Sequence, residues 1–260
     1  MMGRSLQYLS LSMVGVLILA PVILVVIFAF NDVDRGMIWQ GFSSRWVVDI
    51  FRDPESMRAL TNSFIVACMV TAGAWIFGTS LAFSLGALGP RAGVLAGIIM
   101  LAPILTPDLP LAIAQSRFLL EMGGNPSVVS IALGELPYAS AYMAILVLAV
   151  MYTRKVELII HAALDLGATP FQTFRTVFIP ITRPGWIAGC GIVFALSFQD
   201  FIFSFYLGGA GSSTLAVRIY SMLRKGLSPG INMLFVLMLI VVVLTLFIFN
   251  RTEIKREEEL

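Results

Sequence analysis

The chain has 260 residues, of which 58% are hydrophobic and only 12% are charged, and its mean hydropathy is +0.93. Soluble domains carry about 25% charged residues, so this composition excludes a soluble globular enzyme and indicates a polytopic membrane protein. The net charge of +2 is small and spread along the chain, which does not favour nucleic acid as a partner. Cys68 and Cys190 both fall in apolar runs, where free cysteine behaves as a small hydrophobe, so we expect no disulfide and no metal site.

The apolar runs predict an all-α fold with six transmembrane helices, at about 20 residues for each span. The first run is too long for a signal-peptide core of roughly 7 to 15 residues and is expected to remain as a membrane anchor. An even number of spans places both termini on one side, and we expect a single transmembrane domain over residues 1–260. The predicted spans are 9–30, 60–85, 94–120, 127–151, 185–207 and 231–250.

The third predicted span contains the sequence APILTPDLP, in which Pro103, Pro107 and Pro110 each remove a backbone donor and disfavour helical angles at the preceding residue. We therefore expect this helix to break. Asp108 lies in the break near mid-depth, where irregular backbone is tolerated only if it is buried in protein or lines water. A substrate pathway would need such an arrangement; the alternative is a structural kink with a neutralised Asp108.

Two further acids lie within predicted spans, Glu135 in the fourth and Asp200 in the fifth. Each costs about 2.5 to 3.5 kcal/mol near the bilayer centre unless it is solvated or paired. Because no basic residue is an obvious partner for these acids, they predict an acidic, partly hydrated path for a cationic solute. Phe201 and Tyr206, close to Asp200, would add ring faces that attract alkylammonium groups. The alternative is that protonated carboxyls hydrogen-bond between helices.

The loop at residues 154–183 separates the fourth and fifth predicted spans and is predicted to form a helix-turn-helix. Gly167 falls where a helix ends, Thr169 and Gln172 fit a capping box, and Pro170 suits the first turn of the next helix. Such an element fits a groove on a partner, although an amphipathic helix on the membrane surface is the alternative.

Two stripes of side chains are expected on this loop at helical spacing. One is polar and the other is aromatic. The polar stripe comprises Glu157, His161 and Asp165, and the aromatic stripe comprises Phe171, Phe174 and Phe178.

The loop resembles the EAA loop of permease subunits of ATP-binding-cassette (ABC) importers, with two alanines, a glycine four residues after the second, and a hydrophobic-x-hydrophobic-Pro ending. The matching residues are Ala162, Ala163, Gly167, Val177, Ile179 and Pro180. The resemblance implies a type I ABC importer permease fold, with a cytoplasmic coupling helix between spans 4 and 5 that docks on an ATPase subunit. It also implies a cytoplasmic side for this loop, which Lys and Arg counts favour only weakly.

Nearly the whole chain is similar to the second permease subunit of the spermidine and putrescine branch of that family. Matching stretches include WQGFSSRW from Trp39, LSFQD ending at Asp200, and IYSMLRKGLSPGIN from Ile219. The resemblance implies that Asp108 and Asp200 occupy positions of acids in the polyamine path; it assigns no role to Glu135. One residue departs from the family, because His161 stands where a glutamate is usual, and imidazole carries little charge at pH 7. Glu157 or Asp165 would then make the salt bridge to the ATPase, or the contact is weaker.

We therefore expect a bacterial inner-membrane transport subunit that forms half of the pathway for a small cation, with both termini cytoplasmic. The expected partners are a second permease, two ATPase copies and an extracytoplasmic binding protein. The chain has no GxxxxGK[ST] phosphate loop, so we expect no enzymatic activity and no cofactor of its own. A permease for another solute, a proton-coupled transporter and an intramembrane aspartyl protease using Asp108 and Asp200 are the alternatives. The choice of polyamine, the protonation of the three acids and the role of residues 212–230 stay open.

Overall fold

The computed structural model describes residues 2–36, 38–88, 90–153 and 156–257, and within these ranges the regular structure is helical apart from one isolated antiparallel bridge between Asn31 and Phe42. The long helices match the predicted spans in order. The elements are α1 (Met2–Ala29), α2 (Arg45–Arg52), α3 (Pro54–Ala87), α4 (Pro90–Leu105), α5 (Asp108–Glu121), α6 (Val128–Thr153), α7 (Val156–Asp165), α8 (Pro170–Thr173), the π-helix η1 (Phe174–Phe178), α9 (Ile179–Ile181), α10 (Arg183–Phe198), α11 (Ile202–Leu207), α12 (Leu215–Lys225) and α13 (Pro229–Glu257).

The described helices include four that are long and apolar enough to cross a membrane, or up to six if each of two bent pairs is one span. The first bent pair is α4 with α5, at 92°, which confirms the predicted break in the third span. The second joins the α8–α9 segment to α10, at 75°. The apolar run 185–207 differs from the expectation of one helix, because it is divided between α10 and α11.

The chain divides into two compact units, one of residues 1–57 and 217–240, the other of residues 58–216 and 241–260. In the first unit, Asn31 is fully buried and organises the loop that follows α1. Its side-chain nitrogen donates to the carbonyl oxygen of Ile38 and its side-chain oxygen accepts from the backbone of Gln40, both at 2.9 Å. The indole of Trp46 on α2 donates to the backbone oxygen of Asn31 at 3.0 Å. These bonds satisfy the polar groups of a loop that lacks regular structure.

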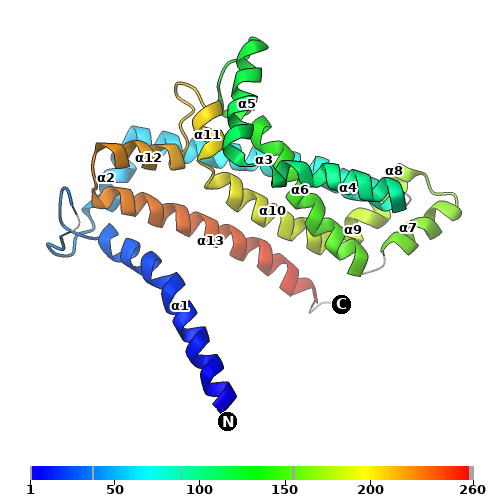
Figure 1. Cartoon of the computed structure of the whole chain (residues 1–260), viewed down its shortest axis with the longest axis horizontal. Coiled ribbons are helices and arrows are strands. Elements are labelled where there is room, and N and C mark those ends of the chain that lie inside the picture. Colours follow the sequence, from blue (N-terminus) through cyan, green and yellow to red (C-terminus); the bar gives the residue numbers. More distant parts are fainter. Residues whose placement is uncertain (1, 37, 89, 154–155, 258–260) are drawn as a thin grey trace. The chain divides into compact units, whose positions relative to one another are not determined.

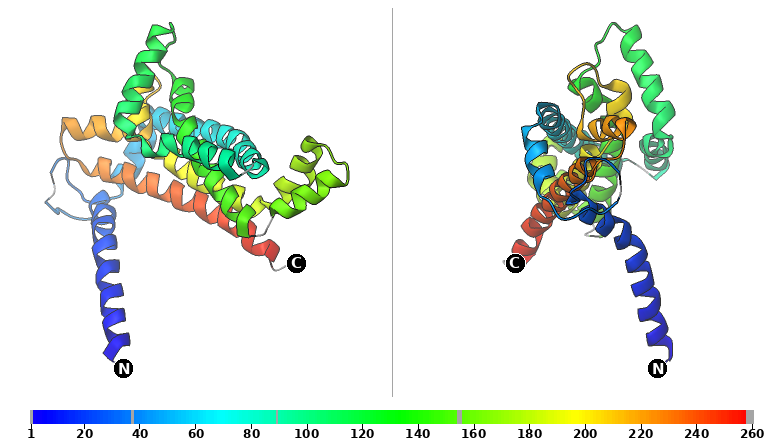
Figure 2. Two further views of the ribbon diagram at one scale, coloured as in Figure 1. Left: turned by 45° about the vertical axis from the view of Figure 1, so that its right-hand side comes forward. Right: turned by 90° about the vertical axis from the view of Figure 1, so that its left-hand side faces the viewer.

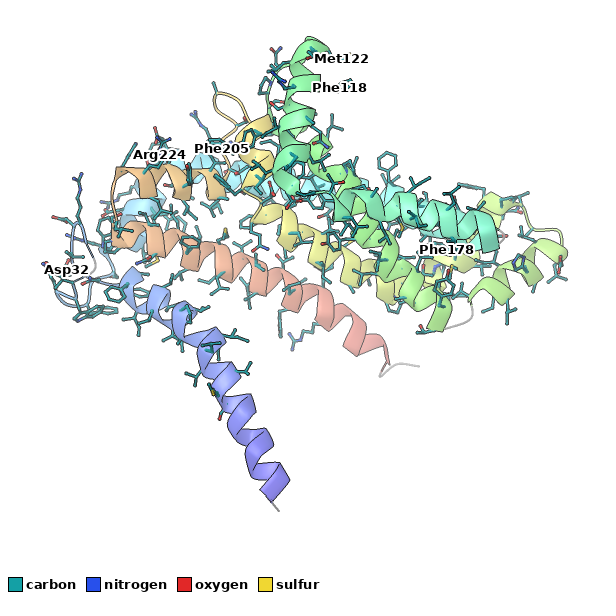
Figure 3. The ribbon with its side chains drawn as sticks, in the orientation of Figure 1. Asp32, Phe118, Met122, Phe178, Phe205 and Arg224 are labelled. Atoms are coloured by element: carbon teal, nitrogen blue, oxygen red, sulfur yellow. The ribbon has the colours of Figure 1, made fainter. Side chains whose placement is uncertain are left out.

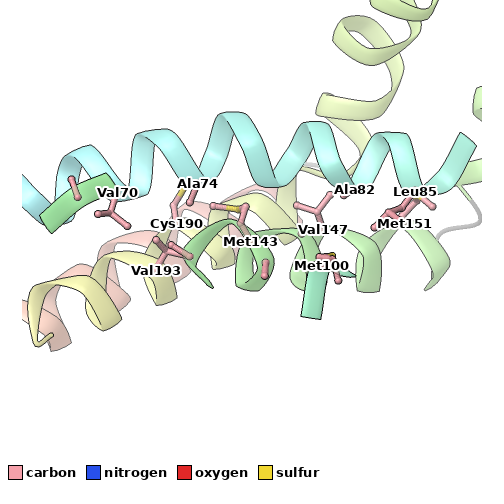
Figure 4. Close-up of a cluster of buried hydrophobic side chains, with 14 of the residues drawn as sticks. Val70, Ala74, Ala82, Leu85, Met100, Met143, Val147, Met151, Cys190 and Val193 are labelled. Carbon is pink, nitrogen blue, oxygen red and sulfur yellow. The ribbon is translucent and has the colours of Figure 1, made fainter. Parts of the chain in front are cut away.

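The core of the second unit lies where α3, α6 and α10 pack together (Figure 4). Met143 of α6 is at the centre and is fully buried. Gly78 of α3 and Gly189 of α10 both face it: a Cβ atom added at Gly78 would lie 2.6 Å from the Met143 Cβ, and one added at Gly189 would lie 2.4 Å from its sulfur. Small residues at these positions allow the helix backbones to approach closely, which is how membrane helices gain packing energy.

Helix α6 packs most extensively against α10 and also contacts α4 and α11, while α11 lies against α5. Figures 1 and 2 show α5 leaving the line of α4 at a steep angle. Phe118 and Met122, which Figure 3 labels at the far end of α5, are exposed. The two helix breaks, α4–α5 and α10–α11, therefore meet beside the middle helix α6.

Candidate functional site

The break between α4 and α5 positions Asp108 as the first residue of α5. Pro103 is accommodated inside α4, but Pro107 has an extended ψ of 133° and forms the cap of α5, so the chain turns sharply at this point. The carboxyl group of Asp108 is exposed within this chain and stands at the amino-terminal end of a 14-residue helix. The helix dipole favours a negative charge at that end.

Asp200 lies in the break between α10 and α11, just before α11 begins, although no proline is present there. The Oδ1 atom of Asp200 accepts hydrogen bonds from the backbone nitrogens of Phe203, at 2.9 Å, and Ser204, at 3.2 Å. These bonds satisfy amide groups that the first turn of α11 leaves without a partner in the helix. Asp200 thus has a structural role at the break, and its other carboxyl oxygen, Oδ2, is not used by these two bonds.

Asp108 and Asp200 line one cavity of about 490 Å³, which we call the acidic cavity. Two tyrosines of α6 face it together with the polar side chain of Gln199, and the described residues of its lining include no Lys or Arg. An opening with two carboxyls, aromatic faces and no positive charge would attract a cation. The lining residues are Pro103, Ile104, Asp108, Tyr138, Tyr142, Leu196, Gln199, Asp200, Phe201 and Ile202.

Glu135 lies on α6, one helical turn before Tyr138, and its side chain has no solvent exposure. Neither carboxyl oxygen has a hydrogen-bond partner among the described residues. Glu135 does not line the acidic cavity, whereas Tyr138, on the same face of α6, does. The third predicted acid therefore lies behind the cavity wall.

The structure brings three of the five predicted pathway residues to the cavity wall: Asp108, Asp200 and Phe201. Tyr206 lies away from the lining; its ring packs edge-on against Phe205 with centroids 5.3 Å apart, and its backbone oxygen accepts from Ser116. Sequence reasoning missed Tyr138 and Tyr142. A signal was available, because both are tyrosines well inside an apolar span, and Tyr138 lies one turn from Glu135.

The 154–183 loop forms the predicted corner. Helix α7 ends at Asp165, and Gly167 has a φ of 89°, a left-handed conformation that favours glycine. The side chain of Thr169 accepts from the backbone of Gln172 while the Gln172 side chain accepts from the backbone of Thr169, so the predicted capping box is confirmed. Pro170 occupies the first turn of α8, as expected.

Burial divides the predicted aromatic stripe of this loop. Phe171 is 71% exposed, whereas Phe178 is fully buried and Phe174 is partly buried against the core. Phe174 and Phe178 stack on each other, and both contact Phe83 of α3 edge-on. The residues between them form a π-helix, which the sequence did not predict. Phe171 alone of the three is thus available to a partner, while Phe174 and Phe178 connect the loop to the core.

The polar stripe is exposed where it is described: His161 and Asp165 both face outward on α7, and the side chain of Glu157 lies outside the described residues. Ala162 and Pro180 are also exposed, and Ala163 is half-buried. Leu166, at the tip of the turn, is 90% exposed. A polar row beside an exposed apolar tip is the surface that a docking helix presents to a groove.

No family model matches the chain. Over 229 residues it is 30% identical to the putrescine transport system permease protein PotI of Escherichia coli (strain K12), which covers 85% of this chain and 80% of PotI. Over 240 residues it is 25% identical to the spermidine/putrescine transport system permease protein PotC of the same organism, with 92% and 90% covered.

Among solved structures, a bacterial ABC transporter involved in the import of the acidic polysaccharide alginate has a chain with the same fold. The TM-score is 0.76 at 15% identity, and the match covers 96% of this chain and 95% of that one. The fold is therefore that of the membrane-spanning subunit of an ABC importer, as the sequence predicted. The chain belongs to the family of transport-system permeases that includes PotI and PotC.

Proposed function

We propose that this chain forms half of the pathway through which an ABC importer carries a polyamine across a bacterial inner membrane. The observation that carries the proposal is the acidic cavity, where Asp108 and Asp200 come from two separate helix breaks to one opening without a basic residue in its described lining. Amine transport by the relatives PotI and PotC supports a cationic cargo. The fold match to an alginate transporter supports the ABC importer architecture and says nothing about the transported solute.

The chemistry of the lining suits an alkyl diamine. Carboxylates accept the N–H groups of ammonium, and charge-assisted hydrogen bonds are roughly twice as strong as neutral ones. The faces of Tyr138, Tyr142 and Phe201 would cover the methylene chain and attract its charged ends, at about 0.5 to 2 kcal/mol for each cation–ring contact. Because Asp200 Oδ1 is held by two backbone donors, the carboxylate is presented to the cavity in a fixed orientation.

The family supports a proposal for the rest of the importer. A second permease would complete the pathway, two cytoplasmic ATPase copies would supply energy, and an extracytoplasmic protein would deliver the amine. The 154–183 loop would dock on the ATPase, with this loop and both termini in the cytoplasm. In this arrangement residues 1–260 act as one transmembrane domain, and ATP is hydrolysed by the partner.

The contact with the ATPase would combine the polar row and the apolar tip of the loop. Leu166 and Phe171 are the most exposed of the large apolar side chains described on it, while His161 and Asp165 supply polar groups. Asp165, one turn after His161, is a described and exposed carboxylate that can replace the glutamate usual in the family. Glu157 is the alternative on the same stripe.

The test is ATP-dependent amine uptake by the complete complex in vesicles, comparing Asp108→Asn and Asp200→Asn with Glu121→Gln. Asparagine caps helices as well as aspartate does, so Asp200→Asn removes the charge while it keeps α11 capped. Hydrogen bonds to charged groups contribute about 1.5 to 3 kcal/mol, so each Asn variant should raise the KM for the amine roughly 10- to 100-fold.

Glu121→Gln, at the exposed end of α5, is the matched control and should leave uptake unchanged. Normal uptake and unchanged competition by other amines in both Asn variants of an assembled complex would reject the cationic path. Uptake that proceeds without ATP would instead favour a secondary transporter.

A further inference from the structure

Glu135 is a buried acid that the two-carboxylate cavity does not use. Its side chain is among the largest that are fully buried in the chain, and both of its oxygens lack a hydrogen-bond partner among the described residues. Buried polar groups in native proteins are nearly always hydrogen-bonded, and leaving one without a partner costs about 1 to 3 kcal/mol, more if it is charged. We therefore expect the carboxyl group of Glu135 to bind a ligand.

Further polar side-chain atoms lie around Glu135. The hydroxyls of Tyr138 and Ser197 lie beside its carboxyl, and Ser197, on α10, is 4% exposed with an unpartnered Oγ. Gln115 of α5 reaches the neighbouring position, where its Oε1 would lie 2.9 Å from a Cβ added at Gly134; that oxygen is likewise buried and unpartnered. Three helices thus direct polar oxygens, each able to accept a hydrogen bond, to one small region. An ammonium group, with three N–H donors and no acceptor, complements such a region.

Tyr138 is common to the acidic cavity and to the surroundings of Glu135. It lines the cavity, and three residues earlier on the same face of α6 is Glu135. Its ring packs against Phe203, with centroids 5.3 Å apart, and edge-on against Tyr142 at 6.4 Å.

We propose that Glu135 is a third amine-binding carboxylate, beside Tyr138, that receives one terminal ammonium group of a triamine while Asp108 and Asp200 hold the other two charges. A diamine has two charges and is satisfied by the cavity carboxylates, so Glu135 makes the pathway prefer the longer, triply charged amine. This inference rests on the proposed function and adds the substrate preference of the same site.

The experiment compares uptake of a triamine, spermidine, with uptake of a diamine, putrescine, by the complete complex carrying Glu135→Gln. The change is nearly isosteric and replaces the carboxyl group with an amide that cannot carry a negative charge. We expect kcat/KM for spermidine to fall at least tenfold more than kcat/KM for putrescine. Ser197→Ala, which removes a single hydroxyl and leaves the carboxylate in place, should shift the ratio in the same direction by a smaller factor.

Glu121→Gln is again the matched control, and we expect an unchanged ratio. An unchanged ratio in both Glu135→Gln and Ser197→Ala, with uptake of the two amines either retained or reduced equally, would overturn the inference and leave the acid as a structural group. If the complex carrying Glu135→Gln does not assemble, the spermidine-to-putrescine ratio of kcat/KM measured for Ser197→Ala is the test. Failure of the unmodified complex to transport either amine would refute the proposed function instead, so the two failures are distinguishable.

Discussion

The ring of Phe83 on α3 packs edge-on against the ring of Phe178 at the end of the π-helix, with centroids 5.1 Å apart and an interplanar angle of 67°. Phe174 stacks on Phe178 at 5.6 Å and meets Phe83 at 5.2 Å, so the three rings form a closed cluster. Phe178 is fully buried there (Figure 3). The cluster joins the exposed surface of the 154–183 loop to a long helix of the core, so a displacement of the loop would act directly on α3.

The first prediction is that Phe83→Leu uncouples ATP hydrolysis from uptake. Leucine retains most of the apolar volume but loses two edge-to-face contacts, each contributing about 0.5 to 1.5 kcal/mol beyond area burial. We expect amine uptake to fall several-fold while ATPase activity of the complex is retained, both measured in the same vesicles.

The matched control is Phe77→Leu, on the same helix at a position that is 57% exposed, which should change neither activity. Equal loss of uptake and hydrolysis in Phe83→Leu would contradict a transmission role, since it would indicate failed assembly.

The features that the sequence predicted correctly are those that depend on local chemistry. Pro107 interrupts the helix between α4 and α5 whatever the surrounding packing, because it has no backbone N–H to donate. The capping box of Thr169 and Gln172 likewise depends on only four consecutive residues. The π-helix at 174–178 could not be predicted in this way, because burial of Phe178 under Phe83 depends on a helix far away in the sequence.

The candidate site was predictable only in part for the same reason. The prolines around Asp108 indicated it as a site residue, and Asp200 was indicated by its charge within an apolar run. The break at Asp200 has no proline or glycine to mark it and is stabilised by the bonds from the Phe203 and Ser204 backbone. Tyr138 reaches the cavity because α6 packs against α10, which is a tertiary relationship.

A second prediction concerns Asp53, between α2 and α3, which binds Arg218 of α12 at 2.8 Å and caps α3 through Ser56. Partial burial acts to raise the pKa of Asp53, but the hydrogen bond from Ser56 and the charge and hydrogen bond of Arg218 outweigh it, so the pKa lies below its ordinary value. A lowered pKa in the folded state means that the stabilisation is present at neutral pH and is lost as the pH falls below about 4.

Asp53→Asn keeps the helix cap and removes the charge. It should therefore lower the free energy of unfolding by about 1 kcal/mol at pH 6, with a difference from wild type that disappears on acidification. Thermal unfolding in detergent, followed by tryptophan fluorescence at several pH values, measures this. Asp34→Asn is the control, because Asp34 pairs with Arg45 but is 89% exposed, and it should have little effect. A difference at Asp53 that stays constant with pH would show that the ion pair is not its source.

A third prediction tests the close packing of α3 on α6. A Cβ at Gly78 would lie 2.6 Å from both the Met143 Cβ and the backbone oxygen of Ser140, and backbone cannot move aside cheaply. Gly78→Ala should therefore lower stability by about 1 to 3 kcal/mol, the usual cost of overpacking. Gly97→Ala on α4 has nothing within 4 Å of the new methyl group and should stabilise its helix by up to about 1 kcal/mol. Similar melting temperatures for the two purified variants would refute the contact.

The last prediction concerns the polar stripe on the 154–183 loop. If α7 docks on a cationic groove of the ATPase, Asp165→Asn should weaken assembly, since a carboxylate facing a basic group is removed, whereas His161→Glu should strengthen it by adding a charge on the same face. Affinity of the detergent-solubilised permease for the ATPase, measured at low and high salt, should change by severalfold in these opposite directions, with smaller effects at high salt. Arg175→Gln, at an exposed position on η1, is the control. It shows whether a charge change elsewhere on this loop also alters the affinity for the ATPase. If neither His161→Glu nor Asp165→Asn alters binding, the polar stripe is not the docking contact. The exposed apolar residues Leu166 and Phe171 would then be the candidate contact surface, and Leu166→Ser alone should abolish binding.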